Sequence, residues 1–304
     1  PAVWAEDSAA QVAALGTGQI MAMSTDAVAA LATTASLALT TTQMAALSSA
    51  QMAGLTDDQV AAWTTDQSAG LSVDQIRAIQ SADIQSLSTV NLQALSTIQT
   101  ASLSSAQTQA MRSSQIAALS AAQASSLSTH ALVALGTAQT RALGTLQMQA
   151  LTTRQIVSLT SEQFAALSMA QVAALQTSQF NAVHTADLAV LSTDGVRALS
   201  SIQVGALRTT QVVALTTAQT AALVAGQVGA FGTSQILALT PAQFAALATT
   251  VIRALGTTQI AVMHTSDLAG LQTASVVAMT TAQWLALTTR QVAALETRQL
   301  ISLG

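Results

Sequence analysis

Two matched segments are the strongest candidates for chemistry in this 304-residue sequence. His184 stands three residues before Asp187, and His264 stands three residues before Asp267. A histidine and a carboxylate at this spacing could bind a metal ion or form an acid–base pair. The spacing also fits the first turn of a helix, where an aspartate at the third helical residue complements the helix dipole. We expect this second, structural role.

The acidic residues in the first third of the chain are another candidate site. They are Asp57, Asp58, Asp66, Asp74 and Asp83. A calcium site requires several carboxylate and carbonyl oxygens that converge on one point. These aspartates recur at intervals close to eight residues. We therefore expect a solvated acidic stripe here and no metal site.

The composition argues against an enzyme and against a nucleic-acid partner. Charged residues make up 7% of the chain, compared with roughly 25% in a typical soluble protein. Cysteine and tyrosine are absent, all nine basic residues are arginine, and the net charge is −4. Phosphate binding needs a dense basic stripe, and catalysis needs clustered reactive side chains. We expect no catalytic, cofactor-binding or metal-binding residues and no nucleic-acid partner.

The whole sequence is built from an eight-residue repeat. Steps of eight from Leu15 reach Leu303 without an insertion or deletion, through 37 apolar residues of which 29 are leucine. We call this leucine position 1. Position 2 is mostly Ser, Thr or Gly, position 3 mostly Thr or Ser, position 5 is Gln in 27 of 37 repeats, position 6 is mostly apolar, and position 8 is small. Positions 1 and 6 are expected to form the core, and the variable positions 4 and 7 to face water.

A continuous α-helix does not fit this period, because two helical turns would need about 4.0 residues each instead of 3.6. Each repeat must therefore interrupt the helix. The segments 56–59 and 160–163 read Ser/Thr-x-x-Gln, a capping box in which hydroxyl and glutamine each accept from a backbone N–H group. Pro241 follows Thr240 at the first helical residue, where a missing N–H group costs nothing.

Glycine at position 2 suggests how the preceding helix ends. Such a glycine often adopts a left-handed backbone just after a helix, and we expect this conformation here. The glycines concerned are Gly16, Gly136, Gly144, Gly232 and Gly256.

These signals predict an all-α solenoid with one helix of about six residues in each repeat, joined by corners of one or two residues. A β-solenoid is the alternative, because Thr and Val favour strands and identical positions would stack. The abundant Ala, Leu, Gln and Met favour helices. We expect a short lead-in at residues 1–7 and one continuous solenoid over residues 8–304.

Two resemblances follow from these motifs. The segment 239–243, Leu-Thr-Pro-Ala-Gln, resembles the helix start of the periplasmic LTxxQ motif family. The array Ala-Leu-Ser/Thr-Thr-x-Gln-Ile/Val resembles the low-complexity repeat regions of large bacterial surface and adhesin-like proteins. The second resemblance implies an exported structural role, outside the cell or at its surface, and it implies no active-site residue.

The expected function is structural. A solenoid needs polar end caps to remain a soluble monomer, and the final Leu303-Gly304 opens a new repeat without one. We expect stacking on another copy or on adjoining repeats, as in a filament, fibre or stalk, and no membrane-spanning segment. One alternative is a solenoid that binds a protein or glycan through Arg141, Arg197 and Arg253 at position 7. Another is a molecular ruler.

Overall fold

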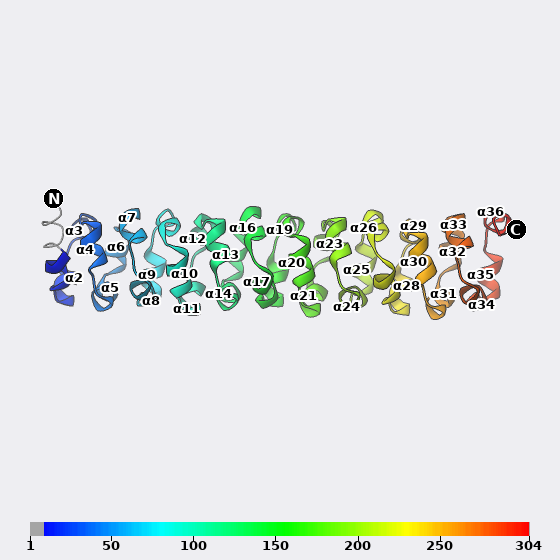
Figure 1. Ribbon diagram of the computed structural model, residues 1–304, viewed down its shortest axis with the longest axis horizontal. Helices are drawn as coiled ribbons and strands as arrows, with labels where there is room; N and C mark the ends of the chain where they lie inside the picture. The colour runs from blue at the N-terminus through cyan, green and yellow to red at the C-terminus, as the bar shows by residue number, and fades with distance from the viewer. Residues whose placement is uncertain (1–8, 304) are drawn as a thin grey trace. The chain divides into compact units, whose positions relative to one another are not determined.

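A computed structural model describes residues 9–303, so the lead-in expected at residues 1–7 lies outside the described residues. The chain divides into two compact units, Pro1–Leu159 and Thr160–Gly304. Within the described range, both units consist of short helices joined by corners, without strands (Figure 1). The predicted all-α solenoid is therefore confirmed, and the β-solenoid alternative is wrong.

The helices of the first unit are five or six residues long, apart from one four-residue 3₁₀ helix, η1. Their bounds are α2 (Thr17–Ala22), α3 (Thr25–Ala29), α4 (Thr33–Leu37), α5 (Thr41–Ala46), α6 (Ser49–Ala53), α7 (Asp57–Ala61), α8 (Thr65–Ala69), α9 (Val73–Ala78), η1 (Asp83–Ser86), α10 (Thr89–Ala94), α11 (Thr97–Ala101), α12 (Ser105–Ala110), α13 (Ser113–Ala118), α14 (Ala121–Ser126), α15 (Thr129–Val133), α16 (Thr137–Ala142), α17 (Thr145–Ala150) and α18 (Thr153–Ser158).

The second unit repeats the same pattern with α-helices of five or six residues. Their bounds are α19 (Ser161–Ala166), α20 (Met169–Ala174), α21 (Thr177–Ala182), α22 (Thr185–Ala189), α23 (Thr193–Ala198), α24 (Ser201–Gly205), α25 (Thr209–Ala214), α26 (Thr217–Ala222), α27 (Ala225–Gly229), α28 (Thr233–Ala238), α29 (Pro241–Ala246), α30 (Thr249–Ala254), α31 (Thr257–Val262), α32 (Thr265–Gly270), α33 (Thr273–Val277), α34 (Thr281–Ala286), α35 (Thr289–Ala293) and α36 (Thr297–Ile301).

Most of the described repeats form their helix as the capping box predicts. In α29, the Thr240 hydroxyl accepts from the backbone N–H of Gln243, the Gln243 side chain accepts from the Thr240 N–H, and Pro241 is the first helical residue. Leu247 then leaves the helix with φ −64° and ψ 135°, which is extended backbone. The corner therefore consists of position 1 and position 2, and the next helix begins at position 3.

The glycines at position 2 are a correction to the sequence analysis. Gly136 has φ −70° and ψ 167°, and Gly232 has φ −71° and ψ 164°. The described residues contain no glycine with a positive φ. The corner has extended backbone, so no residue in it needs a left-handed conformation. Glycine is here an N-cap residue without a side chain.

The helices stack as turns of a solenoid within each unit. Helix α14 packs on α17 in the first unit, and α24 packs on α27 in the second, so each helix contacts the one three places along. Hydrogen bonds from position 5 reach a corner 28 residues earlier, which is three and a half repeats. A turn of the solenoid therefore contains between three and four repeats.

The core contains the two apolar positions of each repeat, as predicted. Position 6 is enclosed in the interior repeats, with Ile76 and Ile236 both 0% exposed, and Leu239 at position 1 is 2% exposed. Position 4 faces outward, and Ile202 there is 72% exposed. Small residues let neighbouring turns approach, since a Cβ atom added to Gly54 would lie 3.5 Å from the Cβ of Thr25 in the turn before.

The helices of the described range are all far shorter than a membrane span, and none is long and apolar enough to cross a bilayer.

Candidate functional site

The glutamine at position 5 is the side chain around which most repeats are organised. Gln75 is 2% exposed, and its Oε1 atom accepts from the backbone N–H of Ser72 at 2.8 Å. The Ser72 hydroxyl accepts in return from the Gln75 N–H at 3.2 Å. One half of the glutamine amide thus completes the cap of its own helix, as the capping-box motif predicts.

The other half of the same amide joins two turns of the solenoid. Gln75 Nε2 donates to the Met44 carbonyl at 2.7 Å and to the Leu47 carbonyl at 2.8 Å, 31 and 28 residues earlier. In the second unit, Gln227 donates to the Val196 carbonyl at 2.9 Å and to the Leu199 carbonyl at 2.8 Å. The Met44 and Val196 carbonyls also accept from the C-cap N–H of Leu47 and Leu199, whereas the Leu47 and Leu199 carbonyls belong to the corner. Only a side chain with both an acceptor and a donor performs both tasks.

Three aspartates replace this glutamine, and each is buried. Asp83, Asp187 and Asp267 are 6%, 5% and 1% exposed. An ionised carboxylate only accepts hydrogen bonds, so it cannot donate to the carbonyls of the earlier turn. The aspartate side chain is also shorter than glutamine by one methylene group.

The His-x-x-Asp segments are helix starts, as expected from the sequence. His264 is the N-cap of α32, and its backbone N–H donates to Asp267 Oδ2 at 2.9 Å. His184 is the N-cap of α22, while Asp187 Oδ1 accepts from the Ser161 hydroxyl at 2.6 Å. Among the described residues, no three His, Asp, Glu or Cys side chains come together in a way that could hold a metal ion.

The solvated acidic stripe is confirmed for four residues and wrong for the fifth. Asp57, Asp58, Asp66 and Asp74 are exposed, whereas Asp83 is buried. Burial is the main cause that raises the pKa of Asp83 to about 7, and a hydrogen bond to Asp57 and the charge of Asp57 raise it further. Burial also raises the pKa of Asp267, although the His264 backbone and charge and the Ser266 side chain oppose this effect.

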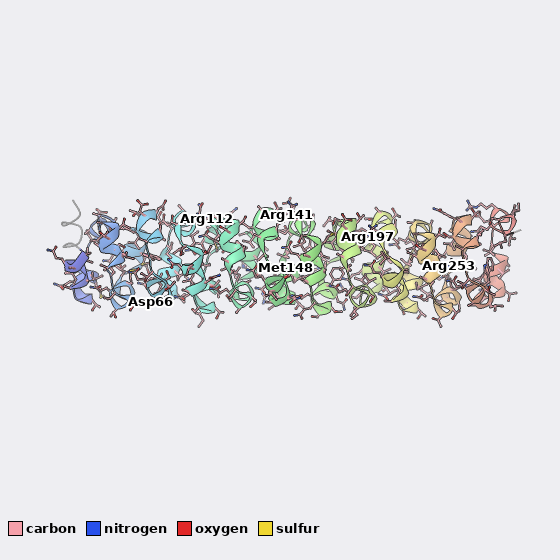
Figure 2. The ribbon with its side chains drawn as sticks, in the orientation of Figure 1. Asp66, Arg112, Arg141, Met148, Arg197 and Arg253 are labelled. Carbon is pink, nitrogen blue, oxygen red and sulfur yellow. The ribbon has the colours of Figure 1, made fainter. Side chains whose placement is uncertain are left out.

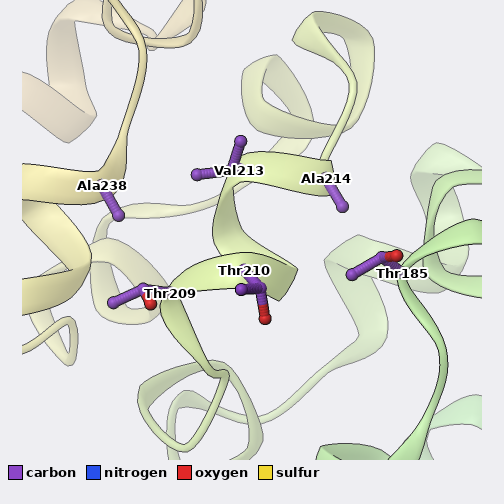
Figure 3. Close-up of a pocket in the computed structure, with 6 residues that line it drawn as sticks. All are labelled: Thr185, Thr209, Thr210, Val213, Ala214 and Ala238. Atoms are coloured by element: carbon purple, nitrogen blue, oxygen red, sulfur yellow. The ribbon is translucent and has the colours of Figure 1, made fainter.

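Open grooves lie between neighbouring turns. In the second unit, a groove of about 500 Å³ is lined by Thr185 of α22, by four residues of α25 and by Ala238 of α28 (Figure 3). The four residues of α25 are Thr209, Thr210, Val213 and Ala214.

The groove recurs in the first unit at the same positions of the repeat. There it is lined by Ser105, Thr129, His130, Val133, Ala134 and Ser158. Both grooves use positions 3, 4, 7 and 8 of helices three places apart. They are therefore products of the repeat and not a unique site, and apart from His130 their lining consists of hydroxyl and methyl groups.

The arginines proposed for binding are surface residues. Arg141 lies in the first unit, and Arg197 and Arg253 lie in the second (Figure 2); all three are exposed. Arg197 Nε donates to the Ala222 carbonyl at 3.5 Å, so its side chain reaches over the next turn.

Sequence reasoning missed the contacts between turns. The capping boxes predict only bonds within a repeat, and the number of repeats per turn is a property of the folded chain. One signal was available, because glutamine outnumbers every other residue at position 5, whereas a cap alone also accepts Glu and Asp. The need for an amide donor indicates a second partner.

The comparisons with known proteins identify a repeat family. The ALTTAQ repeat model matches residues 37–65, 76–113, 145–177, 180–217 and 260–297. A search of the curated proteins finds no match to the chain. The helices, caps and turn-to-turn glutamines described above extend through all five matched segments. Since these segments cover more than half of the sequence, the chain belongs to the ALTTAQ repeat family.

Proposed function

We propose that this protein is a non-catalytic structural scaffold that assembles with copies of itself by stacking turn upon turn. The observation that carries the proposal is the glutamine bond between turns. Each turn presents two unlike faces, with Gln Nε2 donors towards the preceding turn and corner carbonyls towards the following turn. A turn from a second copy would meet the same donors and acceptors as a turn of the same chain.

Such a contact is head-to-tail, because the donor face meets the acceptor face and never its own kind. Head-to-tail contacts that do not close into a ring produce open filaments. The rest of the surface supports this role, since it is rich in hydroxyl and methyl groups and only 7% of the residues are charged. We place the filament outside the cell or at a bacterial surface, because that location fits the resemblance to bacterial surface repeats and a composition without cysteine.

Sedimentation analysis and electron microscopy of the 304-residue chain test the assembly. We expect the sedimentation coefficient to rise with concentration and the images to show unbranched filaments. A single monomeric species at every concentration would contradict the proposal. Labelling of intact source cells with an antibody to the chain tests the location separately.

A variant in the first described turn tests the mechanism of stacking. Gln19 is exposed, and its Oε1 atom caps the Gly16 N–H at 2.7 Å. Gln19→Glu keeps an acceptor for the cap and removes the donor, so we expect weaker assembly at unchanged stability. The matched control is Gln109→Glu at the exposed position 7, which should assemble like the parent.

A further inference from the structure

Asp83 stands at position 5 of its repeat in the first unit, but its contacts differ from those of the position-5 glutamines. We call the hydrogen bonds of those glutamines between turns the ladder. In regular repeats, position 5 caps its helix and donates to the turn before. The 3₁₀ helix η1 begins at Asp83, and in this described segment no side chain caps its start. The neighbouring Gln80 Nε2 takes over part of the lost function by donating to the Ala53 carbonyl at 2.5 Å.

The Asp83 carboxyl instead faces a second carboxyl in the previous turn. The helix η1 packs on α7, which begins at Asp57, 26 residues earlier, and Asp57 raises the pKa of Asp83 through a side-chain hydrogen bond and its charge. The same 26-residue offset joins Asp187 to the Ser161 hydroxyl and Ser275 to the Thr249 hydroxyl. At Asp187 and Ser275, a short side chain at position 5 thus meets position 3 of an earlier repeat. Only in the Asp83 repeat are the residues at both positions acidic.

Two ionised carboxylates cannot form a hydrogen bond, because neither has a proton to donate. Asp83 Oδ2 is buried without a hydrogen-bond partner in the described structure, so a charge on this oxygen is unfavourable. Like carboxylates in one site repel, and one of them then holds its proton well above the usual pH.

We propose that Asp57 and Asp83 form a proton-bridged carboxyl pair that joins two turns of the first unit and opens as the pH rises. In the closed state, one carboxylic acid O–H donates to the other carboxylate, and the pair carries one negative charge. Release of the proton to water leaves two negative charges and breaks the bond between the turns.

In the described part of the chain, the helices that pack on η1 contain no cation that would replace the proton. The helix η1 packs on α7 and α12. The titratable residues of α7 are Asp57 and the exposed Asp58, and α12 has none. Arg77 in α9 pairs with Asp74 at 3.8 Å. The pKa of Asp83, raised to about 7 by burial and by Asp57, agrees with a shared proton.

The direction of the pH effect follows from the two states of the chain. Asp83 has its ordinary pKa of 3.8 when unfolded and a pKa of about 7 when folded. Between these values the folded state binds the extra proton, so the contribution of the pair to stability is full below pH 3.8 and is lost as the pH rises through 7.

Thermal unfolding of the full chain between pH 5 and pH 8 tests the proposal. Asp57→Ser gives Asp83 a hydroxyl partner of the kind that Ser161 provides for Asp187. We therefore expect the pH-dependent loss of melting temperature to be several degrees smaller in this variant than in the parent. The control Asp66→Asn removes an exposed aspartate from α8 and should retain the parent's pH dependence. Only differences between variant and parent are compared.

Infrared spectroscopy detects the proton itself. At pH 5.5 the parent minus Asp83→Asn spectrum should contain the C=O band of a protonated carboxylic acid, and this band should vanish by pH 8.5. A parent whose pH dependence equals that of Asp57→Ser, or a difference spectrum without the band, would overturn the proposal. Stabilisation by millimolar calcium at pH 8 that disappears in Asp83→Asn would also overturn it, because a cation would then bridge the pair.

Discussion

The repeats of Asp83 in the first unit and Asp187 in the second carry the same substitution with opposite consequences. Both aspartates replace the glutamine of the ladder and both are buried. Asp187 meets the hydroxyl of Ser161, which donates to it at 2.6 Å, and its repeat keeps a regular α-helix. Asp83 meets Asp57, and its repeat becomes a 3₁₀ helix. The two repeats therefore differ both in the residue that faces the aspartate from the previous turn and in the form of their helix.

The largest expected effect concerns a regular repeat. Gln75→Leu removes the acceptor for the Ser72 N–H and the donor for the Met44 and Leu47 carbonyls. The loss of a cap and of buried hydrogen bonds should reduce the free energy of unfolding by about 3 kcal/mol. Urea titration followed by circular dichroism measures it. The matched control is Gln85→Leu at the exposed position 7, which should change stability by less than about 0.5 kcal/mol.

The next prediction concerns a substitution that creates an acidic pair in the second unit. Ser161→Asp gives the sequence Thr-Asp-Glu-Gln at 160–163, close to the Thr-Asp-Asp-Gln of 56–59. Asp187 then loses its donor at high pH, which should destabilise the unit by about 2 kcal/mol at pH 8 and less at pH 5. Melting curves at both pH values measure this difference.

Ser161→Ala is the control for that transfer, because it removes the hydroxyl without adding a charge. It should destabilise the chain less than Ser161→Asp at pH 8. If Ser161→Asp has no greater pH dependence than Ser161→Ala, the identity of position 3 does not decide the behaviour of the aspartate, and the comparison between the two repeats fails.

Asp267 provides a third case, in which the earlier residue at position 3 is Pro241 and supplies no donor. Its Oδ1 atom is buried without a hydrogen-bond partner in the described structure. Asp267→Gln keeps an acceptor for the His264 N–H and restores an amide donor, so we expect a gain of about 1 kcal/mol in unfolding free energy. The side chain of Asp267→Asn also carries an amide, but it is one methylene group shorter than glutamine. An equal gain from this variant would show that removal of the charge is sufficient and that a hydrogen bond from the amide to the corner carbonyls is not needed.

The sequence predicts the local part of this architecture and misses its long-range part. Hydroxyl, proline and glutamine fix where each helix begins, because their effect acts within four residues, as at Thr240, Pro241 and Gln243. The burial of Ile76 follows from the period of the apolar residues. The pairing of Asp83 with Asp57 depends on the 26-residue offset between turns, which no local signal specifies. The glycines at position 2 led to a wrong prediction of left-handed backbone. The same position is the N-cap of one helix and follows the C-terminus of the helix before it, and glycine is common in both places.

The smallest expected effect separates packing from helix propensity. Gly205 and Gly229 both occupy position 7, at the ends of α24 and α27. A Cβ atom would meet nothing within 4 Å at Gly229, whereas at Gly205 it would lie 2.9 Å from the Ala230 carbonyl oxygen of the next turn. Gly229→Ala should therefore gain about 0.5–1 kcal/mol from helix propensity.

Gly205→Ala should lose this gain or become destabilising, because the two turns must separate to admit the methyl group. Urea titration of both variants measures the difference between them. An equal gain at both sites would mean that neighbouring turns move apart freely, and the tight contact at Ala230 would then contribute nothing to the register between turns.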